Sequence, residues 1–109
     1  MKDKIKMMYR DIERLLDMEP GSMSKKSRRQ DIVEARWLII SYMHEVKKVR
    51  KVTIARAFEH HHCSTLHALK QVKIRNRLEN AFRAKYEALT GYFKQKYGST
   101  VVWVVNEDM

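Results

Sequence analysis

The spacing of apolar residues most constrains this fold, because such residues recur every three or four positions along most of the chain. This spacing is typical of amphipathic helices. The first run predicts a helix over roughly Lys4–Met18, which ends before the only proline, Pro20, and one of three glycines, Gly21. The apolar positions of this run are Ile5, Met8, Ile12, Leu15 and Leu16. Because little else interrupts the pattern, we predict an all-α fold, a small multi-helix bundle.

Four more helices are expected downstream. Their approximate bounds are Asp31 to Lys47, Val52 to Phe58, His62 or Cys63 to Val72, and, after a bend around Arg75–Asn76, a last helix that ends at Gly98–Ser99. Asp31 suits the N-cap of the first of these helices. The stripe expected to be buried on that helix consists of Ile32, Ala35, Leu38, Ile39, Tyr42, Met43 and Val46, and the stripe on the last helix consists of Leu78, Phe82, Leu89 and Phe93. The β-prone tail around Val101–Val105 is too short to form a sheet alone.

Positive charge is concentrated in the middle of the chain, which has a net charge of +10. Between Lys25 and Arg56, ten basic residues stand against three acids, whereas the rest of the chain has 13 and 10. A solvated face would interleave the two signs, so this excess favours an anionic partner. We expect double-stranded DNA rather than a membrane, because no strongly apolar face accompanies the charge. The single cysteine and the absence of an apolar signal core lead us to expect a cytoplasmic, nucleoid-associated protein.

Two short predicted helices across a tight turn, Val52–Phe58 and Cys63–Val72, have the pattern of a helix-turn-helix. The residues expected to pack them together are Ile54, Ala55, Phe58, Leu66 and Leu69. The residues expected on the exposed first turn of the second helix are His61, His62, Cys63 and Ser64. Short polar side chains at a helix start hydrogen-bond base edges and phosphates, together with the backbone N–H groups there. The pattern therefore predicts contact with DNA at this turn.

A metal site is a second interpretation of the same histidine-rich segment. Cys63 and His67 are four residues apart on the predicted helix, so both could face one ion, with His60 or His61 as a third ligand. No second ligand pair with zinc spacing occurs, and His44 stands alone. We therefore expect no metal and no cofactor. A third interpretation, in which the histidines are surface residues without a role, stays open, and Trp37 can belong either to the core or to a DNA-facing surface.

The stretch "IARAFEHHHCSTLHALKQV" resembles the signature of the carboxy-terminal DNA-binding domain of DnaA, the bacterial replication initiator. That signature reads roughly I-G-x-A-F-G-G-R-D-H-T-T-V-L-H-A. The identical positions in this chain are Ile54, Ala57, Phe58, His62, Leu66, His67 and Ala68, and Ser64 stands for a threonine. Upstream, "SRRQDIVEARWLIISYM" is similar to the basic segment and long helix of that domain. The resemblance covers about Lys25–Val72 and extends toward Tyr92 through "RLENAFRAKYEAL".

The resemblance implies roles for the matching residues. Arg28 would enter the minor groove, and His62 would read bases together with Cys63 and Ser64, beside His61 on the same turn. The residues predicted to contact the DNA backbone or a groove are Lys25, Lys26, Arg29, Arg36, Lys47, Lys48, Arg50, Lys51, His67 and Lys70. The family's aspartate is His61 here and one of its threonines is Cys63, so we expect a different preferred DNA sequence.

We divide the chain into an amino-terminal amphipathic helix and linker over residues 1–21, a DnaA-like helix-turn-helix domain over residues 22–98, and a carboxy-terminal tail over residues 99–109. No phosphate-binding G-x-x-x-x-G-K-[ST] motif occurs, so we expect no ATPase module and no enzyme. We expect sequence-preferring binding of double-stranded DNA, in replication initiation or its regulation. The alternative is a protein-interaction bundle, a replication or transcription regulator that docks a partner such as a replication protein.

Overall fold

The computed structural model describes residues 2–24 and 29–98, and every regular element within these ranges is helical. The five α-helices are α1 (Lys2–Leu15), α2 (Gln30–Ser41), α3 (Lys51–Ala57), α4 (His62–Leu78) and α5 (Asn80–Tyr97). A short 3-10 turn, η1 (Ser22–Ser24), precedes α2, and a π-helical turn, η2 (Tyr42–Val46), continues it. The all-α prediction is thus confirmed, whereas the predicted tail, residues 99–109, lies outside the described residues.

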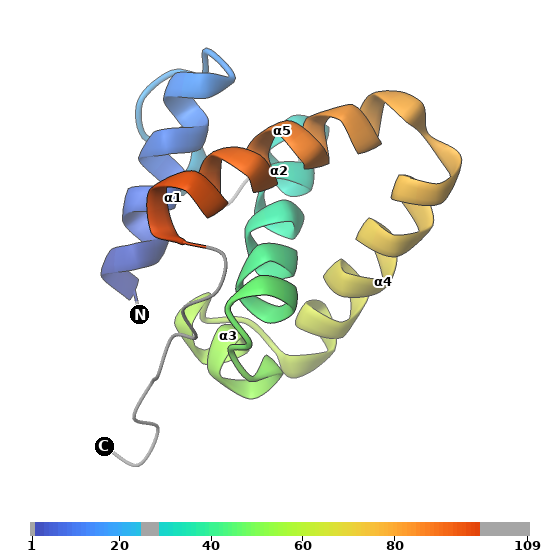
Figure 1. Ribbon diagram of the computed structural model, residues 1–109. Coiled ribbons are helices and arrows are strands. Elements are labelled where there is room, and N and C mark those ends of the chain that lie inside the picture. Colours follow the sequence, from blue (N-terminus) through green and yellow to red (C-terminus); the bar gives the residue numbers. More distant parts are fainter. Residues whose placement is uncertain (1, 25–28, 99–109) are drawn as a thin grey trace.

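α2 runs through the middle of the bundle, and the other helices pack around it (Figure 1). Figure 1 shows α4 along one side, in contact with α2 and α3, and α5 turning back across the bundle toward α1. Ile5, Met8 and Ile12 of α1 lie in the same buried cluster as the apolar residues of α2 and α5. The amino-terminal helix therefore shares the core of the remaining helices.

Periodicity located the helices well, apart from the last break. α2 and η2 together cover the predicted second helix, and the predicted stripe is buried except for Val46, which is partly exposed. The bend predicted around Arg75–Asn76 is wrong, because α4 continues to Leu78 and the chain breaks at Glu79 (φ −122°, ψ 110°). Leu78 is consequently 73% exposed and does not join the buried stripe of α5.

The carboxyl end of α5 is closed by Gly98 and by Tyr42 from η2. Gly98 has φ 89°, a left-handed conformation that favours glycine, and its N–H donates to the Lys94 carbonyl at 2.8 Å. The Tyr42 hydroxyl lies 3.1 Å from the Phe93 carbonyl and 2.8 Å from the Gly98 carbonyl. Burial raises the pKa of Tyr42 to about 12, so the hydroxyl stays protonated and donates.

A buried carboxylate joins α1 to α5. Asp11 is 2% exposed and accepts hydrogen bonds from Lys96 Nζ at 2.7 and 2.9 Å and from the Tyr97 hydroxyl at 2.8 Å. Arg14 adds a contact of 3.3 Å to the same carboxylate. Burial, followed by the neighbouring Asp11, raises the pKa of Tyr97, which keeps its hydroxyl a donor. These four residues are called the Asp11 network below.

None of the helices within residues 2–24 and 29–98 combines the length and apolar character needed to cross a membrane.

Candidate nucleic-acid interface

The start of α4, residues His61 to Ser64, is called the leading edge here. All four side chains are exposed. His61 is the N-cap, and its Nδ1 accepts a hydrogen bond from the backbone N–H of Cys63 at 3.1 Å. The side chains of His62, Cys63 and Ser64 make no hydrogen bond with any other residue of the described ranges. The leading edge therefore presents polar groups that the fold itself does not use.

His60 and Thr65 fix the connection between α3 and α4. His60 Nε2 lies 2.7 Å from Thr65 Oγ1, and the His60 ring stacks on Phe58 with centroids 5.6 Å apart. Burial lowers the pKa of His60, so its ring is neutral at pH 7 and its Nε2 can accept the Thr65 hydroxyl proton. The connection that precedes the leading edge is thus held by a specific pair of side chains.

The packing between α3 and α4 differs from the prediction at one position. Ile54 and Ala55 of α3 and Leu69 of α4 are buried as expected, and Phe58 is partly buried. Leu66 was expected between the helices but is 40% exposed. One residue turns a helix by about 100°, so the fully buried Thr65 takes the inward position and directs Leu66 outward.

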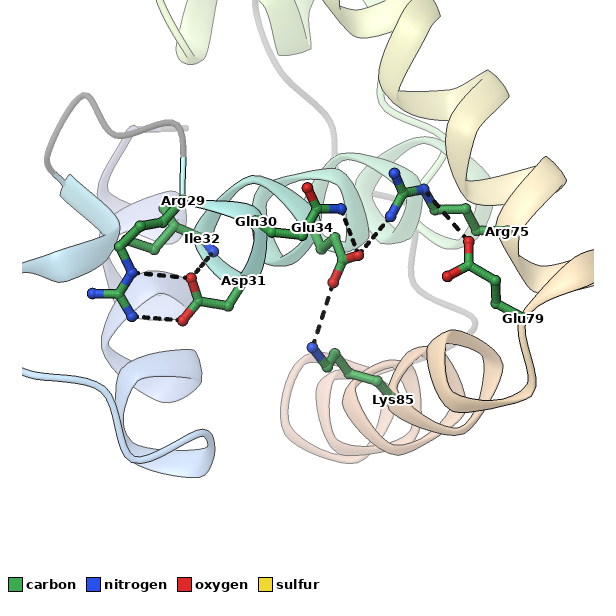
Figure 2. A network of polar contacts seen from close by, with 8 residues as sticks. All are labelled: Arg29, Gln30, Asp31, Ile32, Glu34, Arg75, Glu79 and Lys85. Atoms are coloured by element: carbon green, nitrogen blue, oxygen red, sulfur yellow. Dashed lines mark hydrogen bonds and ion pairs between the residues drawn. The ribbon is translucent and has the colours of Figure 1, made fainter.

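A charged network holds α4 against α2 and α5 (Figure 2). Arg75 Nη1 of α4 lies 2.6 Å from Glu34 Oε1 of α2, and Lys85 Nζ of α5 lies 3.6 Å from the other oxygen. Gln30 Nε2 donates to the same Glu34 Oε1 at 2.9 Å. Arg75 also reaches Glu79, at 3.8 Å. Because three helices meet at one carboxylate, the position of α4 is fixed on the bundle.

Trp37 of α2 lies between the core and the surface. It packs against the buried cluster but stays partly exposed. The guanidinium carbon of Arg75 lies 4.9 Å from its ring centroid, and the His67 ring meets it edge-on at 5.7 Å. Trp37 therefore supports both the Arg75 network and the α4 face that carries His67.

The predicted backbone-contacting residues differ in their surroundings. Lys48, Arg50, His67 and Lys70 are exposed, and Lys51 is half-buried. Arg29 is exposed and donates to Asp31 at 3.2 and 2.7 Å (Figure 2), which lowers the pKa of that carboxyl. Arg36 is half-buried, and its Nη2 donates to the Met23 carbonyl at 2.9 Å. Arg29 and Arg36 thus make contacts within the fold, unlike a purely solvated cation.

Lys47 differs from these surface residues because it is buried, a position that does not fit the phosphate contact predicted for it. Its relative exposure is 0%, and its Nζ donates to the Tyr97 carbonyl at 2.6 Å. Burial, followed by the charge of Lys4, lowers the pKa of Lys47. The ammonium group binds a carbonyl at the end of α5, where the backbone acceptors lack helical partners.

Lys25, Lys26 and Arg28 lie outside the described residues, so the predicted minor-groove contact of Arg28 stays a prediction. The metal interpretation gains no support, since no three His, Cys, Asp or Glu side chains within the described ranges gather closely enough to hold an ion. Sequence reasoning named His60 only as a possible metal ligand and missed its pairing with Thr65. Their five-residue spacing across a helix start is the only signal that could have pointed to them.

Comparison of the chain with models of known families, with curated proteins and with solved structures gave no significant match. The resemblance to the DnaA domain therefore depends on the residues quoted for it.

Proposed function

We propose that this protein binds double-stranded DNA, with the leading edge of α4 in the major groove and the surrounding cations on the phosphates. The observation that carries the proposal is the exposure of the leading edge, where His62, Cys63 and Ser64 leave their polar groups unused within the described fold. Major-groove base edges present donors and acceptors that such side chains can pair with. A helix start adds backbone N–H groups that favour phosphate oxygens.

The electrostatic part of the proposal uses the exposed cations. Lys48, Arg50 and Lys51 precede or begin α3, and Lys70 lies on α4 two turns beyond the leading edge. Each phosphate neutralised by such a cation releases counterions, so affinity falls as salt concentration rises. As in the DnaA domain that the sequence resembles, Arg28 would add a minor-groove contact, and the function would lie in replication initiation or its regulation.

The test is selection of bound fragments from random duplex DNA, followed by titration of the selected sequence and of a random sequence. His62→Ala is expected to weaken binding of the selected duplex by roughly five- to a hundredfold, which corresponds to about 1–3 kcal/mol. Random duplex should bind nearly as before, because phosphate contacts carry no sequence information. His62 is exposed, so the variant should fold normally.

Lys94→Ala serves as the matched control, since Lys94 is an exposed residue of α5 away from the leading edge in sequence. It should leave the preference between the two duplexes unchanged. If the native protein shifts no duplex at low ionic strength, DNA binding is wrong. If His62→Ala weakens both duplexes equally, the leading edge does not read bases.

A second candidate function is docking of a partner protein on the outer side of α4. Leu66, Ile74 and Leu78 follow one another there at four- and eight-residue steps and are 40%, 38% and 73% exposed. Residues at such steps share one side of a helix. This candidate predicts that Leu78→Asp abolishes association with the partner, whereas charge-neutral variants at Lys48 and Arg50 do not.

A further inference from the structure

Beside the leading edge, α2 and α4 leave a hollow of about 480 Å³ between them. The side chains that form its two long walls include Val33, Trp37 and Ile40 of α2 and Cys63, Ser64 and His67 of α4. Val33, Trp37 and Ile40 follow one another at steps of four and three residues, and His67 lies four residues after Cys63 and three after Ser64, so each wall is one side of a helix. The volume lies in the range of sites that hold small molecules.

Rings and apolar groups dominate this hollow. Trp37 and His67 meet there edge to face, and the stacked rings of Phe58 and His60 close one end. Flat ligands pack well against such surfaces, because aromatic pairs gain energy beyond the area that they bury. The shape and composition of the walls thus favour a planar ring.

The polar groups of the hollow limit the chemistry of that ring. The Ser64 hydroxyl and the His67 ring nitrogens make no hydrogen bond with any other residue in the described parts of the chain. A hydroxyl donates and accepts, and a neutral imidazole has one donor and one acceptor nitrogen. A ligand with donors and acceptors along its edge satisfies both, as a nucleobase does.

The charge of the hollow favours an anion. Arg36 lines it, and none of the described residues that line it is acidic. The Arg36 guanidinium is held in place by hydrogen bonds to the Met23 carbonyl and to Tyr9, and it brings a positive charge to the hollow. A cationic ligand would meet only positive or neutral groups, whereas an anionic ligand would be attracted.

We infer that this hollow binds a nucleobase linked to a phosphate, with the ring between α2 and α4 and the phosphate toward Arg36. The inference goes beyond duplex binding. The hollow shares Arg36, Cys63, Ser64 and His67 with the proposed duplex contacts, whereas Val33, Trp37 and Ile40 belong to the hollow alone. The nucleobase has two sources, a free nucleoside monophosphate or an unpaired nucleotide within a DNA strand.

The test follows the indole N–H resonance of Trp37 by NMR. The chain has two tryptophans, so Trp103→Phe leaves Trp37 as the single indole signal. Titration with deoxyadenosine 5′-monophosphate is expected to shift this resonance with a dissociation constant of about 1 mM or tighter. Deoxyadenosine and inorganic phosphate, titrated separately, should each bind roughly tenfold more weakly or worse, because each lacks half of the contacts. No shift with the monophosphate up to about 10 mM overturns the inference.

Two variants in the same background locate the site. Val33→Phe adds a ring to the α2 wall and should abolish the nucleotide response while duplex binding persists. His67→Ala removes an exposed ring, so folding is unaffected, and should weaken the response roughly tenfold. Lys73→Ala, an exposed position on the same helix but outside the hollow, is the matched control and should not change it. An unchanged response in both Val33→Phe and His67→Ala places the nucleotide elsewhere and overturns the inference.

Competition distinguishes the two sources. The competitors are a duplex with one bulged adenosine and a fully paired duplex. If only the bulged duplex displaces the monophosphate, the natural occupant is an unpaired nucleotide. Displacement by neither duplex identifies the free nucleotide. Equal displacement by both duplexes shows that a fully paired duplex covers the hollow through the shared residues, and overturns an unpaired nucleotide as its occupant.

Discussion

The Asp11 network and the leading edge of α4 use polar side chains in opposite ways. Around Asp11, charged and hydroxyl groups from α1 and α5 bind one another, and the carboxylate is almost completely removed from solvent. At the leading edge, His62 and Ser64 are exposed and hydrogen-bond no other described side chain. The first arrangement contributes stability, and the second leaves groups available to a ligand.

The difference also explains why adjacent residues of similar type behave differently. Lys47 and Lys48 are neighbours, yet Lys47 is bound to the carboxyl end of α5 and Lys48 is exposed with φ 57°. A buried polar group must find a partner within the fold, because an unpaired one costs about 1–3 kcal/mol. Substitution of a side chain that is paired within the fold should therefore lower the free energy of unfolding. Substitution of an unpaired side chain at the leading edge should instead lower the affinity for DNA.

The largest effect is expected from Asp11→Ala. Removal of the carboxylate leaves the Lys96 ammonium and the Tyr97 hydroxyl without their shared acceptor in a partly buried site, which should lower the free energy of unfolding by about 3 kcal/mol. Urea denaturation followed by circular dichroism measures this loss. Glu87→Ala, which removes an exposed acid of α5, should change stability by less than about 0.5 kcal/mol. Equal losses in the two variants would remove the distinction between the regions.

A smaller loss of stability is expected from Arg75→Ala. The variant removes the ion pair of 2.6 Å between Arg75 and Glu34, so Lys85 is the remaining cation beside the Glu34 carboxylate. It also uncovers part of the Trp37 ring. We expect a loss of about 2 kcal/mol in urea denaturation, because a hydrogen bond to a charged group contributes 1.5–3 kcal/mol. Arg77→Ala is the control, since Arg77 is exposed two residues further along α4. The Arg75 network does not fix α4 if both arginine variants are equally stable.

The sequence predicted what depends on local spacing. Ile5, Met8 and Ile12 repeat at helical steps and are buried, and Gly98 ends the last helix as expected. The exposure of His62 followed from its place at a helix start. Such features need only the geometry of one helix, so periodicity and capping residues suffice to find them.

What depends on distant partners was missed. Lys47 stands in a basic run with Lys48, and only the arrival of Tyr97, fifty residues later, makes it a buried residue. Asp11 adjoins the apolar stripe of α1, but its partners come from α5. The break at Glu79 was misplaced because no glycine or proline marks it, and Arg75 continues the helix while bound to Glu34. The pairing of distant side chains is not encoded in any local pattern.

The neighbours Lys47 and Lys48 test this comparison through the salt dependence of DNA affinity. Lys48→Gln should flatten the slope of log affinity for duplex DNA against log salt by about 0.9, the contribution of one phosphate contact. Lys47→Met should leave this slope unchanged, because its ammonium binds the Tyr97 carbonyl and neutralises no phosphate. Fluorescence anisotropy at several salt concentrations measures both slopes. A flatter slope in a folded Lys47→Met protein would return Lys47 to the DNA-contacting surface.

The smallest expected effect concerns His60, which precedes the leading edge and is paired with the side chain of Thr65. Burial lowers the pKa of His60 below its unfolded value of about 6.5, so the unfolded chain takes up a proton at a pH where the folded protein does not. The free energy of unfolding should therefore fall as pH decreases below about 6.5, until the folded pKa is reached. Protonation would also end the acceptance of the Thr65 hydroxyl by Nε2. Subtraction of the urea stability of His60→Asn from that of the native protein, between about pH 7.5 and 5, isolates this contribution. If the stability difference between the native protein and His60→Asn does not vary with pH, His60 is as open to solvent as its neighbours on the leading edge. His60 would then belong to the region of unpaired side chains, which would begin directly after Glu59.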